Sequence, residues 1–294
     1  GTTGGSVAFT VKENNYLGKG IKLDASLQLG SDAVRGLFSV TNPNFNYSDK
    51  ALTSTLENTT TDRLTTNGYE TSETGIAFST NFEQYRDFYI SPELSAYFES
   101  VSTNSTASTA LQKQKGDFFD LNFNYALNLD KRNFAYQPSE GFRSLFRQEL
   151  PLIADDTTIK NSYELNVHHE FVEDMVGSFS FFTSAVNSLS GDDVRISKRL
   201  FMPGKRLRGF ETGKVGPKDG LEYVGGNYLT AINLSSSIPK VLSTRENIDF
   251  RIFFDVANIW HVDYSDAINN SNKIRSSTGI GIDWFTPVGP LNFS

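Results

Sequence analysis

A period-two alternation of apolar and polar side chains recurs along almost the whole chain and constrains its fold more than any other feature. The segment IDFRIFFDV at 248–256 is a clear case, because every second residue is apolar and charged residues occupy most positions between them. Successive side chains of a β-strand point to opposite faces, so such a segment has one apolar and one polar face. Similar segments lie at 21–29, 119–130 and 163–171.

Less regular alternation marks the remaining candidate strands, which lie near 6–13, 34–41, 51–58, 74–82, 87–99, 142–150, 176–186, 228–238 and 276–284. With a final segment near residue 290, template matching predicts about fourteen strands. Polar, turn-rich stretches such as STNSTAST at 102–109 separate them. We find neither a helical period of useful length nor a linker that would split the chain. The sequence therefore predicts one all-β domain over 1–294.

Composition excludes several classes of protein. The apolar runs fall short of the roughly 18 residues that a transmembrane helix requires. The negative mean hydropathy still allows a transmembrane β-barrel, because alternating strands average to a polar score. The formal net charge of -7 argues against nucleic acid as a partner. The chain has no cysteine, which excludes disulfides and thiolate chemistry.

Two architectures use this alternation. A soluble β-sandwich would bury the apolar faces between two sheets. An outer-membrane β-barrel would turn the same faces toward lipid and keep the polar faces in its lumen. The barrel is favoured by strands of about ten residues, as a tilted span requires, and by charge on the polar faces. The charged residues of those faces are Asp120, Asp130, Glu164, Glu170, Asp249, Arg251 and Asp255.

The alternation stops between about 195 and 226. This stretch is longer than an ordinary hairpin connection, and long loops are usually functional or disordered. Its apolar residues, among them Leu207 and Val215, disfavour disorder. Its cations, among them Lys205 and Arg208, need acidic partners, which the lumen of a barrel would supply. We therefore expect the loop to fold into the lumen, with an exposed basic loop as the alternative.

Six short motifs resemble, in the same order, those of the BamA family of outer-membrane assembly proteins. They are LDKRNFAYQPSEG (129–141), LRGF (207–210), VGP (215–217), GGN (225–227), FFDVANIW (253–260) and STGIGIDWFTPVGPLNFS (277–294). Each motif is common by itself, but their order over 129–294 is specific. Residues 1–128 resemble the early strands of the family more generically.

This resemblance implies a transmembrane antiparallel β-barrel of sixteen strands, of which the chain would contain the second to the fifteenth. The polypeptide-transport-associated (POTRA) domains of the family would precede residue 1. We therefore expect 1–294 to be a barrel domain truncated at both ends. In the family, the first and last strands meet at a weak seam that opens sideways. The implied location is the bacterial outer membrane.

The resemblance also implies roles within the loop. The residues that match the lumen loop of the family are Leu207, Arg208, Gly209, Phe210, Val215, Gly216 and Pro217. Arg208 would pair with Asp255, which matches a wall aspartate of the family and which alternation independently places on the lumen face. The family has a second acid on the preceding strand, where Ser235 stands instead, so we expect this part of the network to be reduced or supplied by another residue. Gly209 would permit a tight turn, and Phe210 would anchor the loop.

Candidate catalytic and metal-binding residues are not convincing. His168 and His169 are followed by Glu170, but adjacent side chains of a strand point apart, so the two histidines cannot share a metal. The chain has 3 histidines, and none has the setting of a serine–histidine–acid triad. We predict no enzymatic activity, no metal and no cofactor.

The function implied by the resemblance is the folding and insertion of β-barrel proteins into the outer membrane. The partners would be unfolded β-barrel clients, accessory assembly lipoproteins and outer-membrane lipid. An open sheet edge can template an incoming strand and satisfy its main chain before it meets lipid. The alternatives are a TamA-type translocation and assembly barrel, a two-partner secretion pore and, from a different class, a passive porin. An outer-membrane enzyme and a soluble β-sandwich binder are further rivals.

Overall fold

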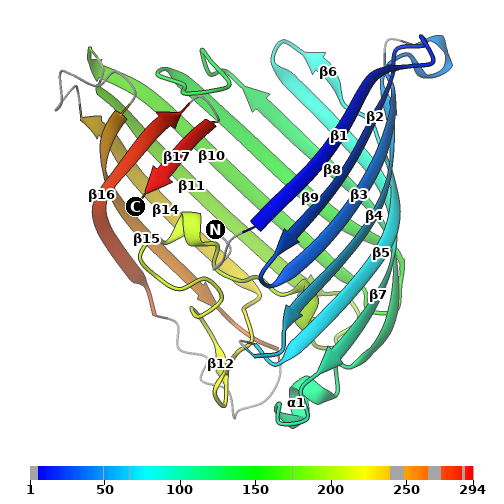
Figure 1. The fold of residues 1–294 in the computed structure, drawn as a ribbon. Coiled ribbons are helices and arrows are strands. Elements are labelled where there is room, and N and C mark those ends of the chain that lie inside the picture. The colour runs from blue at the N-terminus through cyan, green and yellow to red at the C-terminus, as the bar shows by residue number, and fades with distance from the viewer. Residues whose placement is uncertain are drawn as a thin grey trace.

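The chain folds into one large antiparallel β-sheet. A computed structural model describes residues 6–48, 50–65, 67–173, 175–238, 248–263, 273–286 and 289–293. Figure 1 shows the sheet curling around a central space, with its strands tilted and its two terminal strands, β1 and β17, facing the viewer. The ordered path within these residues runs through fourteen strands, and one short strand pairs at its side.

The strands of the path are long and continuous. Their bounds are β1 (Ser6–Tyr16), β2 (Ile21–Gly30), β3 (Ala33–Asn42), β4 (Leu52–Arg63), β5 (Tyr69–Ser79), β7 (Phe88–Thr103), β8 (Gly116–Asp130), β9 (Gly141–Ala154), β10 (Thr158–Val172), β11 (Met175–Ser188), β14 (Tyr228–Ile238), β15 (Ile248–Trp260), β16 (Arg275–Thr286) and β17 (Gly289–Phe293).

The remaining elements are short. They are β6 (Phe82–Tyr85), the hairpin of β12 (Lys218–Asp219) and β13 (Glu222–Tyr223), the helix α1 (Thr109–Gln112), and three 3-10 turns at Phe45–Tyr47, Ile196–Lys198 and Gly204–Arg206. None of the helices in the described parts of the chain is long and apolar enough to cross a membrane.

Each strand of the path pairs antiparallel with the next, so neighbours in sequence are neighbours in space. The large exception is the connection from β11 to β14, which spans 189–227 and contains the β12–β13 hairpin. A smaller one is β6, which pairs beside β7. Every main-chain group inside such a ladder can find a partner on an adjacent strand, as a membrane span requires.

The two faces of the sheet differ as the alternation predicts. On β15, Ile252 and Phe254 are exposed on the outer face, whereas Phe253 and Asp255 are buried on the inner face. Neighbouring strands repeat the pattern, with exposed Leu234 on β14. An apolar outer surface around a polar interior is typical of a transmembrane barrel. The sandwich alternative is wrong, because the described residues contain no second sheet except the small β12–β13 hairpin.

We expect a charge on the outer face to destabilise the barrel. Ile232 lies in the middle of β14, directly opposite Phe181 and Val256 on its two neighbours. Ile232→Lys should lower the free energy of unfolding in lipid vesicles by about 2–4 kcal/mol, because it places an ammonium group in hydrocarbon. Denaturant titration measures this change.

The matched control is Asn122→Lys on β8, because Asn122 lines a polar cavity inside the barrel. This substitution should change the free energy of unfolding by less than about 1 kcal/mol, as at most surface positions. Equal effects of the two lysines would contradict the assignment of the faces.

Candidate functional site

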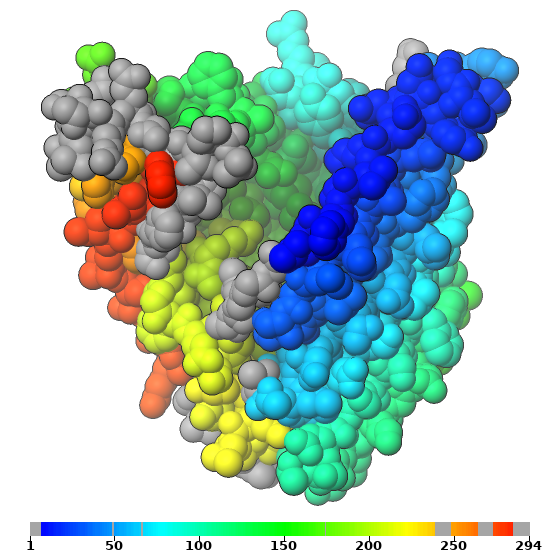
Figure 2. All heavy atoms as spheres, in the orientation of Figure 1, coloured from blue at the N-terminus to red at the C-terminus, as the bar shows by residue number. Residues whose placement is uncertain are grey.

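The connection between β11 and β14 lies inside the curve of the sheet. Its residues, coloured yellow-green to yellow in Figure 2, are visible between the blue strands of the N-terminal side and the orange-red strands of the C-terminal side. We call residues 195–226 of this connection the lumen loop. Two 3-10 turns and the β12–β13 hairpin give it local structure, and an isolated bridge pairs Leu200 with Gly226 across its base.

Apolar contacts hold the middle of the lumen loop against the barrel wall. Met202, Leu207 and Val215 are buried in one cluster with wall residues. The wall residues of this cluster are Leu229, Ala231, Ala257 and Ile259, from β14 and β15. Burial of a large aliphatic side chain contributes about 1.5–3 kcal/mol, so the cluster alone favours the packed position of the loop.

Arg208 binds Asp255 in a two-pronged ion pair. Its Nε and Nη2 atoms donate to the two carboxylate oxygens over 2.8 Å and 2.6 Å. The backbone N–H of Arg208 donates a third hydrogen bond to the same carboxylate, over 3.1 Å. The Asp255 side chain has 0% of its surface exposed and that of Arg208 has 17%. A paired-donor geometry of this kind fixes orientation as well as distance.

An aromatic ring completes the environment of the guanidinium group. The central carbon of Arg208 lies 3.7 Å from the centre of the Phe253 ring. The tip of that ring lies against Gly279 on β16, where a Cβ atom would approach the ring to 2.7 Å. A cation stacked on an aromatic ring gains further electrostatic stabilisation. Gly279 therefore leaves the space that Phe253 needs in order to support Arg208.

Asn233 on β14 also binds Asp255. We call the contacts of Asp255 with Arg208 and Asn233 the Asp255 contact. Asn233 lies directly opposite Asp255 in the strand pairing. Its Nδ2 atom donates to the Asp255 carboxylate over 2.8 Å and to the backbone carbonyl of Arg206 over 2.9 Å. The second acid expected near Ser235 is thus replaced by an amide two residues earlier on the same face. Sequence reasoning missed it because the register between strands was not known.

A second ion pair lies beside this contact. Arg206 Nη2 is 2.8 Å from the Glu164 carboxylate of β10, and its Nη1 donates to the Ser180 hydroxyl of β11 over 2.8 Å. The guanidinium group also lies over the Phe182 ring, 4.5 Å from its centre. Alternation assigned Glu164 to the lumen face, but nothing in the sequence identified Arg206 as its partner. The four strands β10, β11, β14 and β15 therefore all contact the same short segment.

The other predicted loop residues have different environments. Gly209 adopts a φ of 80°, which favours glycine, and it lies in open space. Gly216 also has a positive φ, and a Cβ atom there would approach Ile259 to 2.6 Å. The Pro217 carbonyl accepts a hydrogen bond from the Val224 N–H over 3.2 Å. The expectation for Phe210 is wrong, because 37% of this residue is exposed and Leu207 and Val215 form the buried anchor instead.

The two adjacent histidines contact different partners. His168 Nδ1 lies 2.9 Å from the Ser178 hydroxyl, and His169 Nδ1 lies 3.0 Å from the Glu140 carboxylate. The described residues contain no group of three or more metal-ligating side chains that could hold an ion. The hydrogen bond from His169 also lowers the pKa of Glu140, which lies in the turn before β9.

Fold and loop together define a class: a transmembrane β-barrel with a long loop packed against the inside of its wall. A family model described as the Omp85 superfamily domain matches residues 15–294. The chain belongs to this superfamily.

Individual relatives agree with the family match. The outer membrane protein assembly factor BamA of Nitratidesulfovibrio vulgaris is 24% identical over 298 residues, covering 98% of this chain and 36% of that protein. BamA of Neorickettsia risticii is 26% identical over 172 residues, covering 57% of this chain and 23% of that protein. The chain therefore spans less than half the length of each of these relatives.

A solved structure supports the same fold. The crystal structure of BamA from Haemophilus ducreyi lacking POTRA domains 1–3 superimposes with a TM-score of 0.87 at 19% identity, covering 99% of this chain and 64% of that chain. The predicted barrel architecture of about fourteen strands is confirmed. The chain is a BamA-type β-barrel of the bacterial outer membrane.

We expect the Asp255 contact to contribute strongly to stability. Asp255→Ala should lower the free energy of unfolding by roughly 3–5 kcal/mol, because it leaves the Arg208 and Asn233 donors without their buried acceptor. Denaturant titration in lipid vesicles, together with heat-modifiable gel migration, measures the loss.

The matched control is Lys214→Ala in the same loop. Lys214 pairs with Glu211 at the surface, where both side chains are largely exposed, so its removal should cost less than about 1 kcal/mol. If the two substitutions had equal effects, the Asp255 contact would not be the main attachment of this part of the loop.

Proposed function

We propose that this barrel belongs to a protein that folds β-barrel clients and inserts them into the outer membrane. Membership of the Omp85 superfamily and similarity to two BamA assembly factors support this proposal. The observation that carries it is the Asp255 contact, in which Arg208 holds a loop inside the lumen through two side-chain hydrogen bonds. A loop bound there suits an assembly barrel better than a passive porin, which needs an open passage.

The proposed mechanism needs main-chain hydrogen bonding and no covalent chemistry. An unpaired sheet edge presents a row of N–H and C=O groups, and an incoming strand can add to that edge. The client strand is then paired before it enters hydrocarbon, where an unpaired group would cost several kcal/mol. In this proposal the edges meet at a lateral seam of the whole barrel, and the lumen loop braces the wall while the seam opens.

The proposed partners follow from this mechanism. Clients would be unfolded outer-membrane β-barrel polypeptides, and lipid would contact the apolar outer face that includes Ile252 and Phe254. Accessory assembly lipoproteins are further proposed partners. No nucleotide, metal or other cofactor has a role in the proposal.

The rival functions make different demands on the lumen. A passive porin requires an open passage, which the packed loop disfavours. A TamA-type barrel and a two-partner secretion pore share the motif at 207–210, so the loop does not separate them from an assembly factor of the BamA type. The number and arrangement of the domains that accompany the barrel would discriminate among the three.

The experiment that tests the proposal is complementation by the full-length protein in cells depleted of their own copy. Arg208→Ala and Asp255→Ala should reduce the amount of folded outer-membrane proteins several-fold, and should slow client insertion into proteoliposomes. Activity is compared at equal amounts of folded barrel, judged by heat-modifiable migration. Lys214→Ala serves as the control and should retain full activity.

Unchanged client insertion in both variants would count against the proposed role of the loop. Ion conductance without any defect in other barrels on depletion would instead support the porin.

A further inference from the structure

The lumen loop contacts two separate parts of the barrel wall. Its downstream segment, residues 202–217, packs on β14 and β15, includes the Asp255 contact, and also binds β10 and β11 through Arg206. Its upstream segment, residues 195–199, packs on β7 and β8 through a different set of charged side chains. In the sheet order, β9, β10 and β11 lie between the pair β7–β8 and the pair β14–β15. The loop therefore bridges distant strands of the wall.

Arg195 is the centre of the upstream attachment. Its Nη2 atom lies 2.6 Å from the Asp120 carboxylate of β8, and its Nε atom lies 3.1 Å from the Glu99 carboxylate of β7. The guanidinium carbon lies 4.0 Å from the centre of the Phe118 ring. Only 1% of the Arg195 side chain is exposed. We call the contacts of Arg195, Ser197 and Lys198 with these wall residues the Arg195 contact.

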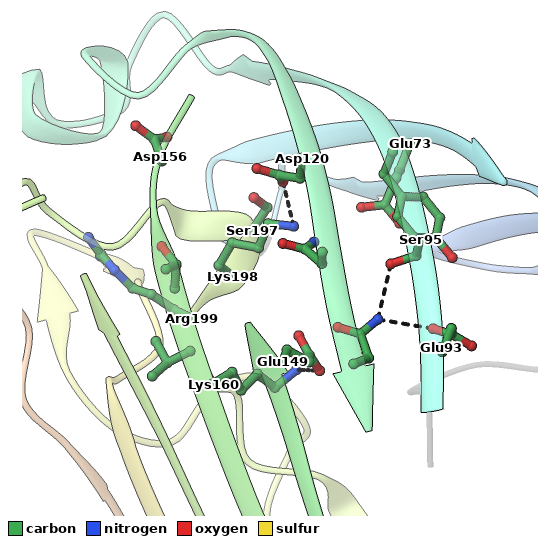
Figure 3. A pocket seen from close by; sticks show the side chains of 15 residues that line it. Glu73, Glu93, Ser95, Asp120, Glu149, Asp156, Lys160, Ser197, Lys198 and Arg199 are labelled. Carbon is green, nitrogen blue, oxygen red and sulfur yellow. Dashed lines mark hydrogen bonds and ion pairs between the residues drawn. The ribbon is translucent and has the colours of Figure 1, made fainter. Parts of the chain in front are cut away.

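The residues that follow Arg195 bind the same two carboxylates. The Ser197 hydroxyl donates to Glu99 over 3.0 Å, and the Lys198 ammonium lies 2.8 Å from Asp120. Figure 3 shows Lys198 extending toward Asp120 from the loop, while Glu73 and Glu93 line the opposite part of the same cavity. The two buried wall acids, Glu99 and Asp120, thus bind two cations and one hydroxyl group. All three groups come from the 3-10 turn Ile196–Lys198 and from Arg195, the residue before it.

A third acid lies at the rim of this site. Asp156, in the turn between β9 and β10, is 3.6 Å from Arg195 Nη1. Burial raises the pKa of Asp156, and the positive charge of Arg195 acts in the opposite direction. The longer distance makes this the weakest of the three ion pairs.

Apolar packing divides the loop at the same place. Ile196 lies in a cluster with Leu111 of α1 and Val101 of β7. Met202, Leu207 and Val215 lie in the other cluster, on β14 and β15. The Ile196 N–H also donates to the Gln114 side chain over 2.7 Å, close to α1. Ion pairs and apolar clusters therefore place most contacts of the two segments on different walls. One contact crosses over, because Asn67, between β4 and β5, donates a hydrogen bond to the Gly213 carbonyl over 3.5 Å.

The two attachments differ in enclosure and geometry. Arg195 is almost completely enclosed, with three carboxylates within ion-pair distance and one hydrogen bond, to Asp120. Arg208 is partly exposed and donates three hydrogen bonds to the single carboxylate of Asp255. The downstream attachment is also near the C-terminal end of the sheet, because β16 and β17 are the strands that follow β15 in the described part of the chain. A lateral movement of that end of the sheet would therefore strain the Asp255 contact before it strains the Arg195 contact.

We propose that Arg195 is the positioning residue of a fixed anchor, which keeps the upstream segment on β7 and β8 while the Asp255 contact opens and closes. This inference rests on the proposed function, since client insertion supplies the movement. The two contacts then have different roles. The Arg195 contact keeps the loop in the lumen, and the Asp255 contact yields when the wall moves.

Limited trypsin digestion of the full-length protein in proteoliposomes tests the anchor, because each segment contains its own cleavage sites. The upstream sites that are scored are Lys198 and Arg199, and the downstream sites that are scored are Lys205, Arg206 and Lys214. Arg195 and Arg208 are themselves trypsin sites and are left out because the variants remove them. Arg208→Met should raise downstream cleavage several-fold and leave the upstream sites protected. Arg195→Met should expose Lys198 and Arg199. Arg195→Lys keeps the charge and should restore most of the protection.

Matched controls address folding and charge. Lys205→Met removes an exposed cation of the same loop and should leave cleavage at the other sites unchanged. Should Arg195→Met fail to give heat-modifiable barrel, Glu99→Gln with Asp120→Asn weakens the same contact from the wall side and should expose the same two sites. Equal exposure of both segments in Arg208→Met would overturn the proposal, and so would continued protection of Lys198 and Arg199 without Arg195.

A second arm tests the movement. Addition of an unfolded outer-membrane β-barrel polypeptide, diluted from urea, should raise downstream cleavage of the wild-type protein and leave upstream cleavage low. Insertion of that polypeptide is scored separately by its own heat-modifiable migration. If the added polypeptide inserted without any change in downstream cleavage, the proposal that the Asp255 contact opens would be wrong. The proposed assembly function would still hold. Loss of insertion in the wild type would instead contradict the proposed function.

Discussion

A main-chain amide or carbonyl cannot remain unpaired in hydrocarbon, and the rest of this structure depends on that constraint. The chain satisfies it with long antiparallel strands, each paired with its neighbour in sequence. In a hydrogen-bonded sheet of this kind, each side chain points either to the outer or to the inner face. Apolar residues such as Phe254 then face outward, and polar residues such as Asp255 face a lumen that the membrane cannot reach.

The same constraint explains the charges of the lumen loop. Carboxylates on the inner face are removed from bulk water, so each needs a hydrogen-bonding partner or a cation. The loop supplies Arg195, Arg206 and Arg208, and the wall supplies acids from β7, β8, β10 and β15. Arginine suits these positions because its planar group forms several directed hydrogen bonds and stays charged when buried. A chain with net negative charge thus concentrates cations where its own wall is acidic.

Much of the fold and part of the site could be predicted. Alternation is a local property, so it located the strands, the inward placement of Glu164 and the interruption after β11. The resemblance of the motifs at 207–210 and 253–260 connected Arg208 with Asp255. The prediction for Phe210 was wrong, because it depended on how distant segments pack. The residue that replaces the expected acid near Ser235 could not be identified for the same reason. Asn233 reaches Asp255 only through the register of β14 on β15.

The sequence by itself determined that the chain forms β-strands with one apolar and one polar face, since that pattern involves only neighbouring residues. It also determined that a basic loop interrupts them. Only the tertiary structure decided which wall residue each cation binds. Arg195 and Asp120 are far apart in the chain and meet only because the loop folds back across the lumen. The physical reason is that a buried ion pair depends on three-dimensional proximity, which no local pattern encodes.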